Sequence, residues 1–90
     1  MTPAVVTLYR RPACGLCDEA ERLLGPLMAG LGASLRTVDI SASADLLDRF
    51  GLAIPVVEVD GVEVARAPLR RSALEGALRE ALSGRGDAPR

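Results

Sequence analysis

Two hydrophobic periods alternate along this chain, and each change of period marks the end of one predicted element. Residues 4–9 form a nearly continuous apolar run, which is typical of a strand covered on both faces. From Gly15 to Leu31 the apolar residues recur at helical spacing, which predicts one amphipathic helix. Because Pro26 cannot donate a hydrogen bond to the preceding turn, we expect a kink or an early end of this helix there.

The middle of the chain is predicted as a second strand and a short helix. The strand covers residues 34–40, and Ser41 or Ser43 offers an N-cap to the helix that follows it. Gly51 stands just after the last turn, where glycine commonly stops a helix. The residues expected to face inward are Leu46, Leu47 and Phe50.

A hairpin and a last helix complete the pattern. Two short strands are predicted, at residues 56–59 and 62–64. Asp60 and Gly61 between them are a common turn signal for a β-hairpin. Ser72 and Glu75 have the spacing of a capping box at the start of a helix, and Gly84 is expected to end that helix.

The resulting order is β-α-β-α-β-β-α. A strand, a helix and a strand in succession favour a right-handed crossover between parallel strands, and the hairpin adds two antiparallel strands. We therefore expect an α/β fold with a mixed four-stranded sheet flanked by helices on both faces. Residues 1–84 are expected to form this single domain, with 85–90 as a flexible polar tail.

Composition and charge narrow the range of partners. The net charge is −1, from 11 basic and 12 acidic residues, and Tyr9 and Phe50 are the only aromatic residues. The chain thus lacks the positive charge and the stacking surfaces that favour nucleic-acid binding. It also has no apolar run near the ~20 residues of a membrane span and no signal-peptide pattern. We expect a cytoplasmic protein with no nucleic-acid or membrane partner.

The chemistry-bearing motif is Cys14-Gly15-Leu16-Cys17, at the junction of the first strand and the first helix. Free N–H groups and the helix dipole stabilise an anion at a helix N-terminus. A thiol pKa at such a site falls from ~8.5 to between ~3.5 and ~7.5. We expect Cys14 to be the exposed attacking sulfur and Cys17, one turn deeper, to be the buried resolving sulfur.

Other interpretations of the two cysteines remain open at this point. They could form a structural disulfide or be inert core thiols, although that is less common in a reducing compartment. Since the chain has no histidine, Cys-His nucleophile pairs and a mixed His/Cys metal site within one chain are excluded. Two chains could still share zinc or an iron–sulfur cluster between paired CxxC motifs. A non-catalytic adaptor is a third alternative.

The combined motifs resemble a known family. A CxxC after the first strand, Ile54-Pro55 before the third, and an Asp-Gly hairpin are similar to the marks of the thioredoxin fold. The compact length resembles the glutaredoxin branch, and in particular small bacterial glutaredoxin-like proteins. The resemblance covers roughly residues 5–82.

Several roles follow from this resemblance. Cys14 is implied as the nucleophile, Cys17 as the resolving cysteine and Pro55 as a cis-proline facing them. Ile54 is implied to offer its backbone N–H and C=O to a substrate strand. Arg11 stands three residues before Cys14, where glutaredoxins often place a lysine that binds a carboxylate of glutathione.

One stretch departs from the glutaredoxin pattern. Glutaredoxins usually follow the last hairpin with a Gly-Gly pair and an acidic residue, which hold the γ-glutamyl end of glutathione. Residues 64–68 here have neither, and Leu16 replaces the usual aromatic residue before the second cysteine. We therefore expect weak use of glutathione.

These observations predict a monomeric thiol–disulfide oxidoreductase that reduces protein or small-molecule disulfides. No cofactor is expected to be tightly bound. The expected partners are a disulfide-bearing protein substrate and a thiol reductant or reductase, with glutathione as a candidate reductant.

Overall fold

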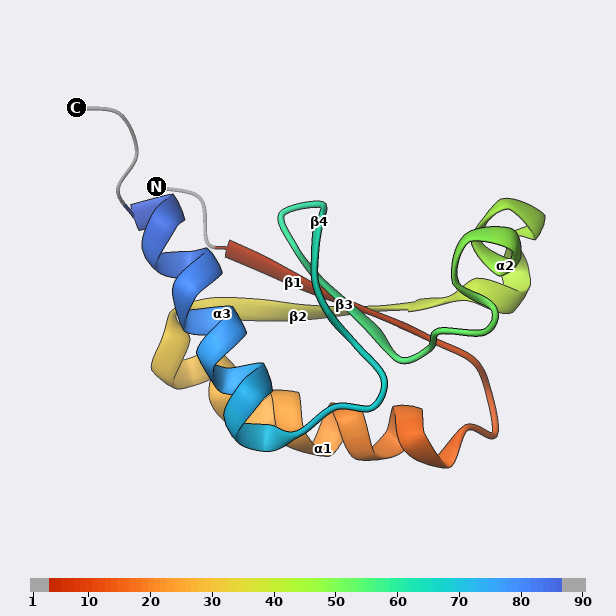
Figure 1. Ribbon diagram of the computed structural model, residues 1–90, viewed down its shortest axis with the longest axis horizontal. Coiled ribbons are helices and arrows are strands. Elements are labelled where there is room, and N and C mark those ends of the chain that lie inside the picture. Colours follow the sequence, from red (N-terminus) through yellow and green to blue (C-terminus); the bar gives the residue numbers. More distant parts are fainter. Residues whose placement is uncertain (1–3, 87–90) are drawn as a thin grey trace.

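The computed structural model describes residues 4–86 (Figure 1). Its elements are β1 (Ala4–Arg10), α1 (Gly15–Leu31), β2 (Ala33–Asp39), a 3-10 turn η1 (Ile40–Ala42), α2 (Ala44–Phe50), β3 (Val56–Val59), β4 (Val62–Arg66) and α3 (Arg71–Gly86). This order of strands and α-helices is the one that the sequence pattern predicts.

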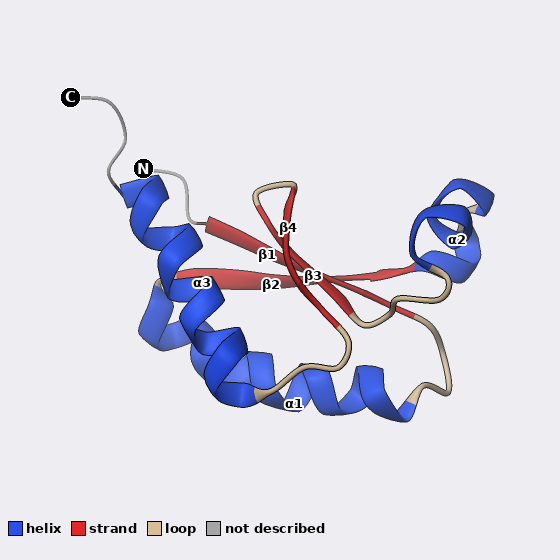
Figure 2. Ribbon diagram, viewed as in Figure 1, coloured by secondary structure: helices blue, strands red, loops and turns tan. Residues whose placement is uncertain are grey.

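The four strands form one mixed sheet in the order β2-β1-β3-β4 (Figure 2). β1 runs parallel to β2 and antiparallel to β3, and β3 runs antiparallel to β4. The parallel pair is joined through α1, as expected for a β-α-β unit. The predicted mixed four-stranded sheet is therefore confirmed.

The two faces of the sheet carry separate apolar clusters. α1 and α3 cover one face, and the buried side chains there are Val6, Leu8, Ala20, Leu24, Met28, Val57, Val59, Leu74 and Leu78. On the other face, Phe50 of α2 packs with Ile40 and Val56, and its ring stacks on Tyr9 with centroids 4.5 Å apart. Figure 1 shows α2 at one end of the sheet, away from α3. No helix within residues 4–86 is long and apolar enough to cross a membrane.

The hairpin between β3 and β4 has the predicted two-residue turn. Val59 pairs with Val62, which leaves Asp60 and Gly61 as the loop. Both residues have positive φ, 49° and 88°, as a type I′ turn requires. The turn lies beside the start of β1, because Val59 also pairs with Val6. It is thus at the opposite end of β1 from the cysteines.

Pro26 does not end α1, which continues through it to Leu31. Leu24 and Met28, on either side of the proline, are both buried in the core. A proline inside a helix costs ~3 kcal/mol, and burying two such side chains contributes about as much or more. The helix ends at Gly32, whose φ of 65° gives a left-handed C-cap. Of the kink or early end expected at Pro26, the early end is therefore wrong.

The short helix α2 follows its predicted N-cap. Ser43 accepts a hydrogen bond from the Leu46 N–H at 3.3 Å, while Asp39 caps η1 before it. Leu47, expected to face inward, is exposed. Gly51 has right-handed helical geometry rather than the left-handed stop that the sequence suggested. A Cβ at this residue would lie 2.5 Å from the Leu47 carbonyl oxygen, so close approach explains the glycine.

The capping box predicted for α3 does not form. The helix begins at Arg71, so Ser72 lies within its first turn, and Glu75 instead bonds Arg79 at 2.8 Å. The helix also continues past Gly84 to Gly86, since a glycine in a helix costs only ~1 kcal/mol. The first two residues of the expected tail are thus helical, and residues 87–90 lie outside the described part of the chain.

Candidate functional site

A disulfide joins Cys14 and Cys17 at the start of α1, with 5.2 Å between their Cα atoms. Cys14 is the N-cap of the helix: its Sγ accepts a hydrogen bond from the Cys17 N–H at 3.2 Å. The Cys14 carbonyl accepts the first helical bond, from the Asp18 N–H at 3.0 Å. The sulfur of Cys14 thus lies where the first-turn N–H groups stabilise negative charge.

The two sulfur-bearing residues differ in exposure. Cys17 is fully buried beneath the first turn, whereas Cys14 is only partly buried. Thiol–disulfide exchange needs direct contact between the attacking sulfur and the disulfide. Of the two sulfur-bearing residues, Cys14 is the more accessible and Cys17 is the buried one, in the order that the sequence predicts.

The residue before the pair has a strained backbone. Ala13 has φ of 55°, in the left-handed region where a Cβ costs roughly 1–2 kcal/mol. The next residue, Cys14, returns to an extended conformation with φ of −113°. This reversal brings the chain from the end of β1 into the N-terminus of α1 in a short loop.

The segment that enters β3 contributes Pro55 to a pocket that Leu16, between the two cysteines, also lines. The peptide bond between Ile54 and Pro55 is cis, and Pro55 is fully buried. The Ile54 N–H donates to the Phe50 carbonyl at 3.2 Å. The expectation that this donor is free for a substrate strand was therefore wrong, because the end of α2 already uses it. The Ile54 carbonyl has no backbone partner within residues 4–86.

A second cis bond precedes Pro68, just after β4. The Ala67 N–H donates to the Pro55 carbonyl at 2.9 Å, so this segment is tied to the first cis-proline. Sequence reasoning missed the second cis bond, since only ~5–6% of X-Pro bonds are cis and nothing local distinguishes them.

An apolar pocket opens between α1 and these two proline segments, with a volume of about 90 Å³. Leu16, which stands between the two cysteines, is 62% exposed at its wall. The lining residues are Leu16, Glu19, Ala20, Leu23, Pro55, Ala67, Pro68 and Leu69. The pocket joins residues beside Cys17 to the stretch where glutaredoxins hold the γ-glutamyl end of glutathione.

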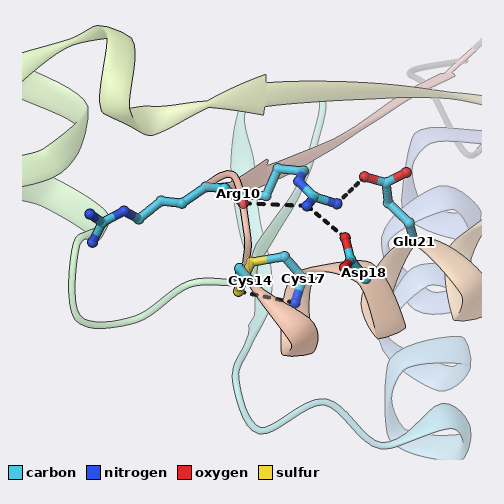
Figure 3. Close-up of polar contacts among 6 residues, drawn as sticks. Arg10, Cys14, Cys17, Asp18 and Glu21 are labelled. Carbon is cyan, nitrogen blue, oxygen red and sulfur yellow. Dashed lines mark hydrogen bonds and ion pairs between the residues drawn. A yellow bond between two sulfur atoms is a disulfide. The ribbon is translucent and has the colours of Figure 1, made fainter.

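The two arginines before the motif behave differently. Arg10 is the last residue of β1, and its guanidinium bonds Asp18 at 2.7 Å and also Glu21 (Figure 3). Arg10 is therefore a strand residue held by two ion pairs, not a solvated loop residue. Arg11 is exposed. Hydrogen bonds from Ser41 lower the pKa of Asp39, and the charges of Arg10 and, to a smaller extent, Arg11 add to this effect.

Within residues 4–86 there is no group of three or more histidine, cysteine or acidic side chains placed to hold a metal ion.

Comparisons with known proteins agree with this geometry. Residues 5–83 match the model of a family described as "Glutaredoxin-like domain (DUF836)". The chain is similar to the protein XcR50 from X. campestris, with 32% identity, TM-score 0.69, and coverage of 93% of this chain and 99% of that one. No curated protein matches it.

Two further structures share the fold. Mitochondrial thioredoxin 3 from Saccharomyces cerevisiae has 19% identity and TM-score 0.65, with 89% of this chain and 80% of that chain covered. A buckwheat glutaredoxin, solved as a complex with glutathione, has 20% identity and TM-score 0.53, with 90% and 78% covered.

Proposed function

Because this chain belongs to the glutaredoxin-like (DUF836) family, we propose that it is a dithiol oxidoreductase that reduces disulfides. The observation that carries the proposal is the Cys14–Cys17 disulfide at a helix N-terminus, with one cysteine accessible and the other buried. This arrangement supplies both the thiolate that attacks and the neighbouring thiol that completes the reaction.

The reaction has two exchange steps. The Cys14 thiolate attacks one sulfur of a substrate disulfide, forms a mixed disulfide and releases the other substrate sulfur as a thiolate. Cys17 then loses its proton and attacks the Cys14 sulfur, which closes the intramolecular disulfide and releases the second substrate thiolate. The substrate gains two electrons from the enzyme dithiol. Of the two protons that its thiolates take up, one comes from Cys17 and the other from water.

Activation of Cys14 comes from the start of α1. The Cys17 N–H donates a hydrogen bond to the Cys14 Sγ. This bond and the dipole of the helix favour a negative charge on the Cys14 sulfur. Cys17 is buried, which disfavours its thiolate until attack is under way. The two thiols are therefore expected to ionise in order, Cys14 first.

The pocket beside the disulfide favours a protein substrate. Leu16, Leu23, Pro55 and Pro68 present apolar surface to it. Such walls stabilise an apolar side chain next to the substrate cysteine, and Glu19 is the one charged residue among the lining residues. The Ile54 carbonyl remains as an acceptor for one backbone N–H of the bound peptide.

Reduction of the Cys14–Cys17 disulfide back to the dithiol requires a thiol reductant or a reductase. Such electron donors are abundant in the cytoplasm, and we place this activity there. We propose that the chain acts as a monomer. Arg11 is exposed before Cys14 and can offer a charge to a glutathione carboxylate. Residues 64–68 lack the glutaredoxin residues that hold the γ-glutamyl end of glutathione. A thioredoxin-type reductase or another dithiol is therefore the favoured electron donor.

Reduction of insulin disulfides under a limiting dithiol tests the proposal. We expect turnover by the native chain and none by Cys14→Ser. Cys17→Ser should form a stable mixed disulfide with one substrate sulfur, visible as an added mass that a reductant removes. Equal insulin reduction by the native chain and Cys14→Ser would refute the proposal.

A further inference from the structure

Each redox cysteine is followed by an acidic residue one helical turn later. Asp18 stands four residues after Cys14, and Glu21 four residues after Cys17. Side chains four apart on a helix are neighbours, which places Glu21 one turn from Cys17. Asp18 is held next to Cys14 by the hydrogen bond from its N–H to the Cys14 carbonyl at 3.0 Å. An unneutralised carboxylate at this spacing disfavours a thiolate, because like charges repel.

Arg10 contacts both acids from the neighbouring strand. Its Nη2 donates to the Asp18 carboxylate at 2.7 Å and to the Arg11 carbonyl at 3.3 Å, and its Nη1 donates to Glu21. The Arg10 side chain is 18% exposed, less than Asp18 at 52% or Glu21 at 41%. Figure 3 shows the two carboxylates reaching toward the one guanidinium, above the first turns of α1.

We propose that Arg10 is a positioning residue that neutralises Asp18 and Glu21 and thereby keeps Cys14 in its reactive thiolate form. The proposal rests on the proposed function for the role of Cys14 as the attacking thiol. Arg10 acts through the two carboxylates: with it their combined charge is −1, and without it −2.

The other charged groups around the start of α1 do not neutralise Asp18 and Glu21, so Arg10 sets their combined charge. Asp39, at the end of β2, accepts hydrogen bonds from the backbone and hydroxyl of Ser41. Glu19 lines the apolar pocket on another side of α1. The charge of Arg10 also acts on Asp39, and that of the exposed Arg11 does so to a smaller extent. Arg10 therefore supplies the charge that both (i, i+4) acids meet.

Four variants separate charge from structural support. Arg10→Met should raise the Cys14 thiol pKa by about 0.5–1 unit, since two partly exposed carboxylates then act on the sulfur. The pair Asp18→Asn and Glu21→Gln should lower that pKa by a larger amount, because the combined charge then changes from −1 to +1. All three changes together give a combined charge of 0, so the pKa should fall between the native value and that of the double variant. Arg10→Lys keeps the charge and should leave the pKa nearly unchanged.

The readout is the rate of iodoacetamide alkylation of the reduced protein against pH, with peptide mapping to assign each thiol. Thermal melting by circular dichroism confirms that each variant is folded. Equilibration with glutathione buffers adds a second measure: a tenfold loss of thiolate corresponds to at most about 30 mV toward a more reducing potential. Arg10→Met should therefore be about 15–30 mV more reducing.

An unchanged Cys14 pKa in Arg10→Met would overturn the proposal. So would a raised pKa in the Asp18→Asn and Glu21→Gln pair, since that would show that the link itself, rather than its charge, matters. None of these measurements needs substrate turnover. The pKa shifts can thus be found in a protein that fails the insulin assay, which separates this proposal from the proposed function.

Discussion

Replacing Leu16 by serine removes an apolar side chain between the two cysteines and leaves the core intact. Burying a whole leucine side chain is worth about 1.5–3 kcal/mol. Because Leu16 is 62% exposed, full cover by a protein substrate is worth about 1–2 kcal/mol. We expect Leu16→Ser to lower kcat/KM for insulin by about five- to thirty-fold. A small disulfide that does not reach the pocket should be reduced at nearly the native rate.

Val62→Ser is the matched control, since Val62 is 66% exposed but lies beside the hairpin turn at the far end of the sheet. It should leave kcat/KM unchanged for both substrates. The alkylation profile of Cys14 in Leu16→Ser shows whether the thiol itself has changed. Equal losses for insulin and the small disulfide, or no loss for insulin, would refute the role given to the pocket.

Three further outcomes follow from contacts described above. In a glutathione-coupled assay we expect roughly 30- to 1000-fold lower catalytic efficiency than an authentic glutaredoxin, because the contacts that hold the γ-glutamyl end are replaced. Burial and the hydrogen bond to Glu58 raise the pKa of Tyr9 above 10.0, so this stabilisation is complete below pH 10 and is lost as pH rises further. Tyr9→Phe should flatten that alkaline loss in denaturant titrations at pH 9–11. Gly51→Ala should destabilise the fold by about 1–3 kcal/mol, because its Cβ would lie against the Leu47 carbonyl. Gly30→Ala, where a Cβ meets open space, should instead stabilise it by about 0.5–1 kcal/mol, and equal melting shifts would contradict the argument.

The order of elements could be predicted because each has a clear hydrophobic period and the hairpin has a strong turn signal. The errors fall where a local signal competes with tertiary packing. Pro26 ought to stop a helix, yet the burial of Leu24 and Met28 carries α1 through it. Ser72 and Glu75 have the right spacing for a cap, but α3 begins one residue before Ser72.

The site was predictable as far as its local motif. Cys14 and Cys17 could be placed at a helix start, because a strand period gives way to a helix period at that point. The cis isomer of the Ala67–Pro68 bond could not be predicted, because no local sequence signal distinguishes cis from trans X-Pro bonds. The role of Arg10 depends on a contact between strand and helix, although the acid four residues after each cysteine was visible in the sequence.

The hydrogen bond between Tyr9 and Glu58 gives the protein an intrinsic optical reporter. Tyr9 is the single tyrosine, and the chain has no tryptophan, so near-ultraviolet emission arises from this one ring with almost no background. Its hydroxyl lies 2.8 Å from a buried carboxylate, a proton acceptor that quenches phenol fluorescence. Separation of β1 from β3 breaks that contact and brightens the emission. Unfolding of the central strand pair can therefore be followed in the unlabelled native chain.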